Sequence, residues 1–102
     1  MSANVFGAVA VFAPGVPGTV SVTSSSSAAT AIPTLALNGG KLWLKCSSKA
    51  HIIFGLSNVT DATSSHMPIT ADQDYLITMP GGWTHFKIIR SSADGTLHYS
   101  VA

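Results

Sequence analysis

The chain has very little charge to place on its surface. Glutamate is absent, and five lysines and arginines with four aspartates make up only 9% of the 102 residues, whereas a soluble domain usually carries about 25%. The formal net charge of +1 provides no long-range attraction to nucleic acid or to an acidic membrane surface. We therefore expect neither as a partner, and we expect neighbouring protein subunits to cover much of the surface.

Cysteine and long hydrophobic runs are also scarce. The single Cys46 cannot close an internal disulfide, so no oxidising compartment is required. Glycine and proline interrupt the apolar N-terminal stretch well before the ~20 residues that a membrane helix needs. That stretch also lacks the basic n-region of a secretory signal, so we expect the chain to be made and used without signal-peptide secretion.

Residues 1–18 are apolar and rich in small side chains. Pro14 and Pro17, each next to a glycine, forbid a regular helix or a central strand there. The pattern predicts an extended arm over residues 1–18, followed by a single β domain over residues 19–102. Large apolar side chains on such an arm must pack on their own domain or on another subunit. The candidate contact residues of the arm are Val5, Phe6, Val9, Val11 and Phe12.

The rest of the chain alternates between apolar and polar residues with a period of two. After the turn signal at residues 38–40, Leu42, Leu44 and Cys46 share one face of a predicted strand. The segment around residues 19–30 begins as a strand and continues as a loop or an edge. Similar strands are expected near residues 50–54, 67–69, 73–79, 83–90 and 96–101, and no segment has a helical period. About six to eight short strands predict an all-β fold, a small antiparallel β-sandwich or a jelly-roll-like barrel.

The histidines and carboxylates do not form a recognisable metal motif. The four histidines lie far apart, without the short ligand spacing that zinc sites use, so we interpret them as surface or interface side chains. Asp72 and Asp74 would share one strand face and could bind a hard cation, but calcium needs six to eight oxygen ligands. The alternative is a solvated turn that leads into a strand.

Nucleophilic catalysis has little support in this sequence. Cys46 and His51 could be imagined as a thiolate and its base, but Cys46 lies in phase with Leu42 and Leu44 and is interpreted as a buried, inert thiol. No nucleophile, base and oxyanion donor can be assembled. We therefore expect no enzymatic activity, no cofactor and no metal.

Aromatic residues are the remaining candidates for a binding site. Trp43 and Trp83 are predicted as interface anchors, because tryptophan is enriched among the residues that dominate binding energy. An alternative is a sugar-binding platform, in which Trp43, Trp83 and Tyr99, with Tyr75 beside them, stack on sugar rings.

The C-terminal half carries a further pattern. It consists of an apolar strand ending in Phe-Gly, a Val-Thr and Thr-Ser loop, a Pro-Ile step, a strand ending in proline, a Thr-His-hydrophobic strand and a closing hairpin strand. The matching positions are Phe54-Gly55, Val59-Thr60, Thr63-Ser64, Pro68-Ile69, Met79-Pro80, Thr84-His85-Phe86 and Gly95-Thr96-Leu97-His98-Tyr99. In this pattern the chain, from about Leu42 to its end, resembles small β-rich virion structural proteins of tailed bacteriophages. Trp83, Lys87 and Arg90 depart from it.

The resemblance implies a decoration or cement protein on the outside of a phage capsid. Such a protein would be assembled in the host cytoplasm, bind the major capsid protein of the expanded lattice and form a trimer. A head-to-tail, tail or fibre component is the structural alternative, and a carbohydrate-binding β module is the alternative from another class.

Overall fold

The computed structural model of the protein describes residues 18–101, which form an all-β domain, so the predicted fold class is confirmed. These residues make eight strands and one short 3-10 helix. In chain order the elements are β1 (Gly18–Val22), β2 (Thr30–Ala31), η1 (Thr34–Ala36), β3 (Lys41–Cys46), β4 (Ala50–Gly55), β5 (Met67–Ile69), β6 (Tyr75–Thr78), β7 (His85–Arg90) and β8 (Gly95–Val101).

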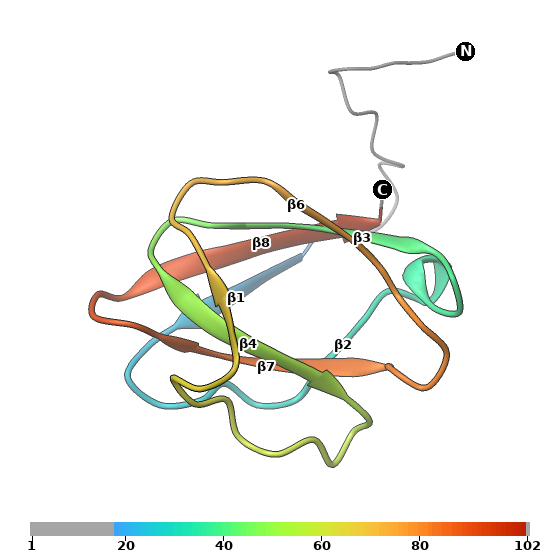
Figure 1. Ribbon diagram of the computed structural model, residues 1–102, viewed down its shortest axis with the longest axis horizontal. Helices are drawn as coiled ribbons and strands as arrows, with labels where there is room; N and C mark the ends of the chain where they lie inside the picture. The colour runs from blue at the N-terminus through green and yellow to red at the C-terminus, as the bar shows by residue number, and fades with distance from the viewer. Residues whose placement is uncertain (1–17, 102) are drawn as a thin grey trace.

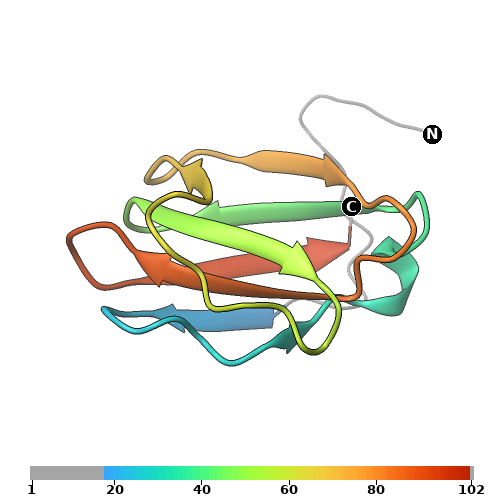
Figure 2. The same ribbon diagram turned by 60° about the horizontal axis from the view of Figure 1, so that its bottom comes forward.

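The strands form two four-stranded antiparallel sheets that face each other, as Figures 1 and 2 show. The first sheet has the order β1-β8-β3-β6 and the second the order β2-β7-β4-β5. Only β4 and β5 follow one another along the chain and also pair in one sheet; every other connection between consecutive strands passes to the opposite sheet. The chain therefore crosses from one sheet to the other at almost every connection, and the fold is a β-sandwich.

Alternation along the strands builds the core between the sheets. Leu42, Leu44 and Cys46 on β3 are fully buried, and so are Phe86 and Ile88 on β7, as their period-two spacing predicts. The other buried apolar residues of the cluster are Val22, Ile32, Ala36, Ala50, Ile52, Ile69, Met79, Leu97 and Val101. Every strand except the two-residue β2 and the edge strand β6 contributes at least one of these residues.

The predicted turn before β3 is present and is tied to the end of β6. Asn38 and Gly39 have φ angles of 53° and 93°, the left-handed region that asparagine and glycine tolerate best. The Gly39 N–H donates to the Met79 carbonyl oxygen at 2.6 Å, and the Met79 N–H donates to the Gly40 carbonyl oxygen at 2.9 Å. These bonds fix the position at which β6 ends and the following loop begins.

Gly18, the first described residue, belongs to β1 and pairs with Tyr99 of β8. The Tyr99 ring occupies the space that a Cβ atom at position 18 would need, so a larger residue there would have to displace the ring. The remainder of the predicted arm, including Val5, Phe6, Val9, Val11 and Phe12, lies outside the described residues.

The long loop of residues 56–66 crosses the outer face of the second sheet. Lys87 Nζ on β7 forms an ion pair with Asp61 Oδ1 at 3.0 Å, and the Ala62 N–H donates to Ser26 Oγ at 2.9 Å on the far side of β7. The chain must then return across β7 and β4 to reach β5. His51, on the outer face of β4, is only 9% exposed. Its interpretation as a surface histidine is therefore wrong, because sequence patterning does not reveal which loop covers a strand.

Residues 18–101 contain no helix that is long and apolar enough to cross a membrane.

Candidate functional site

The candidate site is an apolar groove on the side of the sandwich where β6 of one sheet faces β4 and β5 of the other. β5 has only three residues and pairs with Ala50, His51 and Ile52. The next residues of β4, Ile53 to Gly55, pair with β7 on one side, but no residue of β5 pairs with them on the other. β6 is itself the edge strand of its sheet. Two strand edges therefore border the groove, and an edge of this kind is a template for pairing with another chain.

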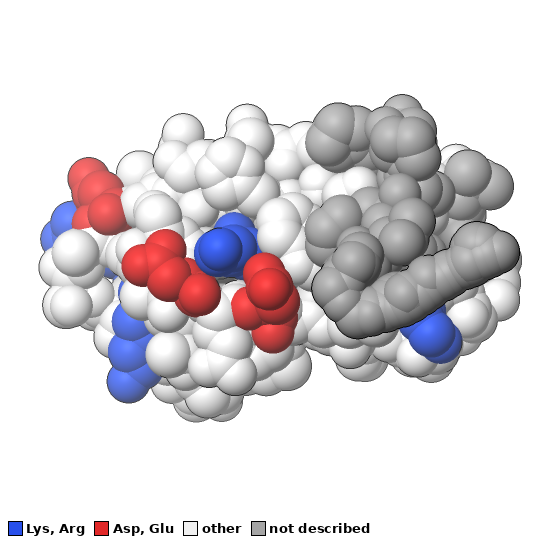
Figure 3. Space-filling model, turned by 90° about the horizontal axis from the view of Figure 1, so that it is seen from above, with Lys and Arg blue, Asp and Glu red and all other residues white. Residues whose placement is uncertain are grey.

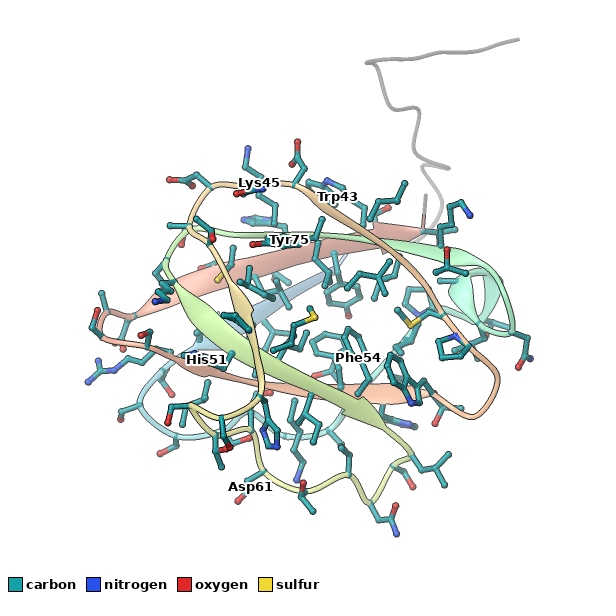
Figure 4. The ribbon with its side chains drawn as sticks, viewed as in Figure 1. Trp43, Lys45, His51, Phe54, Asp61 and Tyr75 are labelled. Carbon is teal, nitrogen blue, oxygen red and sulfur yellow. The ribbon has the colours of Figure 1, made fainter. Side chains whose placement is uncertain are left out.

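Aromatic rings connect the groove to the core. Phe54, on the inward face of β4, stacks on Trp83 with ring centroids 5.1 Å apart and planes within 5° of parallel. Phe54 also contacts the fully buried Phe86 at 6.2 Å, and Phe86 meets Tyr99 edge-on at 5.4 Å. Figure 4 shows Phe54 between the two layers of strands. The apolar lining of the groove is therefore continuous with the hydrophobic core, and the packing of Phe54 against Trp83 and Phe86 determines its shape.

The groove has a volume of about 560 Å³ and is lined almost entirely by apolar side chains. This volume lies in the range of sites that bind small molecules or peptide side chains, about 300–1,000 Å³. Met67 and Trp83 remain 40% and 37% exposed there, although both are large and apolar. Its lining is Ile52, Ile53, Phe54, His66, Met67, Ile77, Thr78, Pro80 and Trp83.

No charged side chain lines the groove, and its histidine is held in place locally. His66 Nδ1 accepts a hydrogen bond from the Thr63 N–H at 2.9 Å within the turn that precedes β5. Thr78 is the other polar lining residue, and its hydroxyl lies 3.4 Å from Lys41 Nζ. An occupant would therefore be held by apolar contact and by backbone hydrogen bonds, not by charge.

Trp43, the second predicted anchor, lies elsewhere. It is half-buried on the outer face of β3, and its Nε1–H donates to Asp74 Oδ1 at 3.2 Å. It borders a separate hollow of about 400 Å³ with Gly18, Thr19, His98 and Tyr99. Figure 4 shows Trp43 and Lys45 on the upper side, away from Phe54. Figure 3 shows that side, where most charged side chains gather toward one end of the described surface.

The structure therefore separates the aromatic residues that a sugar platform would need. Trp43 and Tyr99 share one hollow and Trp83 lines the other. Tyr75 points its hydroxyl toward Thr70, whose backbone N–H donates to it at 2.8 Å. Trp43 and Trp83 therefore do not form one shared surface, because Trp43 lies on β3 and Trp83 lies in the loop before β7, beside the other hollow.

The residues considered for catalysis or metal binding are also apart. Cys46 is fully buried on the inward face of β3, whereas His51 lies on the outer face of β4 in the other sheet. Within residues 18–101 no group of three or more metal-ligating side chains comes together. Asp72 lies in an exposed turn with φ 57°, and Asp74 comes just before β6. The two carboxylates therefore do not share a strand face and belong to an exposed turn that leads into the strand.

The two remaining histidines lie on strand faces away from the core, as expected. His98 is exposed on β8 between Thr19 and Lys45, and His85 is half-buried on β7 with Nδ1 2.8 Å from the Thr84 hydroxyl.

No protein-family model, curated protein or solved structure matches the chain. The assignment of a role therefore depends on the groove and on the residues that form it.

The sequence pointed to Trp83 but not to its partners in the groove. Alternation identifies Phe54 only as a strand residue, and the sequence gives no sign that Met67 and Pro80 belong to a binding site. A usable signal is the proline in the short segment Met67-Pro68-Ile69, because proline confines a strand to the edge of a sheet. A short edge strand beside the longer strand of residues 50–55 indicates that part of the longer strand lacks a partner.

Proposed function

We propose that the protein is a non-enzymatic structural subunit that binds neighbouring proteins in a larger assembly, and that this assembly is a phage virion. The observation that carries the proposal is the uncharged groove with Trp83 and Met67 exposed beside the unpaired end of β4. Exposed apolar surface next to an open strand edge is typical of protein–protein contacts.

Within this role, the resemblance of the C-terminal half to phage virion proteins favours a decoration or cement protein. Each copy would contact the major capsid protein and contribute binding free energy only where the expanded lattice presents the complementary surface. Binding of that kind stabilises the mature shell, because a ligand shifts an equilibrium toward the state to which it binds more tightly.

The test is cosedimentation of the purified protein with the capsids of the phage that carries its gene. Mature expanded shells and unexpanded precursor shells are compared. We expect saturable binding to expanded shells and at least tenfold weaker binding to precursor shells. Binding to tails or tail fibres in place of shells would support the tail-component alternative and overturn the capsid role.

A matched pair of variants connects this binding to the groove. Trp83→Ala removes the exposed ring at the groove, whereas Leu76→Ala removes an apolar side chain, 57% exposed, that pairs with Trp43 across β3 and β6. We expect Trp83→Ala to weaken shell binding by at least tenfold and Leu76→Ala to change it by less than threefold. Equal effects of the two substitutions would show that shell binding does not depend on the groove.

A further inference from the structure

We propose that the groove receives the apolar segment of residues 5–12 from a second copy of this chain, added as a strand beside the unpaired end of β4. This inference rests on the proposed structural role and names the partner that fills the groove.

The first argument is chemical. Residues 1–17 contain no charged side chain and include Val5, Phe6, Val9, Val11 and Phe12. The groove is likewise uncharged, and its exposed groups are the Trp83 ring and the Met67 thioether chain. Among the segments of this sequence that lie outside the described residues, this one alone is long and apolar enough to fill the groove.

The second argument is the backbone. Residues 4–12 read Asn-Val-Phe-Gly-Ala-Val-Ala-Val-Phe, with small residues between larger ones, so in an extended conformation larger side chains occur on both faces. Strand addition needs an extended segment with alternating side chains and a receiving edge with free N–H and C=O groups. β5 pairs only with residues 50–52 of β4, so residues 53–55 have no partner strand on that side. The Gly55 carbonyl oxygen accepts from the Thr84 N–H on the other side, and successive residues of a strand point their backbone groups to opposite sides, so the backbone of Phe54 faces the open edge.

The third argument is the length of the connection. β1 and β6 lie at opposite edges of their sheet, three strand spacings or roughly 14 Å apart. The six Cα–Cα steps from Phe12 to Gly18 span at most about 21 Å. Within one chain residues 13–17 would use most of this length to cross the sheet and would also have to pass around its end, where the turn at residues 38–40 is bonded to Met79. A neighbouring copy imposes no such limit, so we assign the segment to a second copy.

Exchange of this segment would be reciprocal in a closed ring, because each copy offers one segment and one groove. This arrangement agrees with the expected trimer, in which every interface is the same. It also explains why a chain with a small core would expose Met67 and Trp83 on an isolated subunit.

The test is a disulfide trap between two different copies. In a Cys46→Ala background, one preparation carries Val9→Cys and a second, larger tagged preparation carries Met67→Cys. After mixing and oxidation we expect a band of the combined mass on a non-reducing gel. The matched control replaces Met67→Cys by Leu76→Cys, which lies on the outer face of the first sheet, and we expect no such band.

Two outcomes would overturn the proposal. A cross-link formed only inside a single chain that carries both Val9→Cys and Met67→Cys would assign the segment to its own groove. The absence of any cross-link would exclude the groove as its site.

A second measurement does not depend on the introduced cysteines. In a variant that lacks residues 2–17 and carries Trp43→Phe, Trp83 is the only tryptophan. Addition of a synthetic peptide of residues 4–13 should shift its emission to shorter wavelength, and an unchanged spectrum would count against the proposal. Light scattering of this variant should give the mass of a monomer, and of the full chain about three times that mass. Because these assays use purified protein without capsids, a failure here leaves the shell-binding result unaffected, and the reverse also holds.

Discussion

The contact between Trp83 and Phe54 makes a quantitative prediction about stability. Trp83 is 37% exposed, so about two thirds of the residue is removed from water. A tryptophan of roughly 250 Å² then buries about 150 Å², worth about 4 kcal/mol at ~25 cal/mol per Å². Residual burial in the unfolded chain lowers this by up to ~40%, and an open groove adds no closed cavity. We expect Trp83→Ala to reduce the free energy of unfolding by about 2–3 kcal/mol.

The assay is urea denaturation followed by far-ultraviolet circular dichroism and by the fluorescence of Trp43. Trp83→Phe keeps an aromatic ring over Phe54 and should lose only about 1 kcal/mol, because offset stacking tolerates the smaller ring. Leu76→Ala is the matched control and should lose less than about 0.5 kcal/mol. A loss for Trp83→Ala no larger than that of the control would refute the stacked arrangement, and Trp83 would then be a free surface group.

Three further predictions address the fold. Gly18→Ala forces a methyl group into the Tyr99 ring and should cost about 1–3 kcal/mol, measured as a lower urea midpoint; an unchanged midpoint would contradict the close approach. Cys46→Ser places a hydroxyl in a fully buried apolar site and should be about 1–2 kcal/mol less stable than Cys46→Ala, with equal stability arguing against full burial. Hydrogen bonds from the Thr70 side chain and backbone N–H lower the pKa of Tyr75 from its usual 10.0. Because the folded protein favours the ionised phenol, its contribution to stability is present at pH above 10 and is lost as the pH falls through the lowered pKa. An absorbance titration of the parent should show a tyrosine step below pH 10.0 that is absent from Tyr75→Phe, and the stability difference from the parent should be independent of pH below that step.

Local alternation was sufficient to predict the strands and much of the core. Leu42, Leu44 and Cys46 are buried because every second residue of a strand points to the same side, a property that depends only on the strand's own sequence. Phe86 and Ile88 on β7 are buried for the same reason. Turn chemistry was equally local, since Asn38 and Gly39 take the positive φ angles that their side chains tolerate.

The groove could not be predicted in this way, because it results from pairing between distant segments. Phe54 and Trp83 meet because β4 pairs with β7 in a register that sets Gly55 opposite His85, just after Trp83. The other wall of the groove is formed by β6, which belongs to the opposite sheet. The alternation of apolar and polar residues does not determine the order of the strands or the side on which a loop crosses them. For the same reason it does not predict that His51 is buried.

The two tryptophans show how residue type and surroundings contribute separately to a site. Residue type alone predicts both tryptophans as anchors. In the structure, Trp43 lies on a sheet face and donates a hydrogen bond to Asp74, whereas Trp83 stacks on Phe54 beside a strand edge. Trp83 therefore combines a fixed orientation with exposed apolar area, which is the combination that a binding anchor needs.

The structure shows where a chain with so little charge exposes its large apolar side chains. Scarcity of charge predicted that neighbours cover much of the surface, but the large exposed apolar residues among positions 18–101 are few: Leu56, Met67, Leu76 and Trp83. Two of them line the same groove, so apolar exposure is concentrated and not spread over the domain. A subunit coated on all sides would need apolar area on several faces, whereas a subunit with one receiving groove needs a single complementary strand. Within residues 18–101 the distribution of exposed apolar side chains therefore favours this groove over the other faces as the apolar contact with a neighbouring protein.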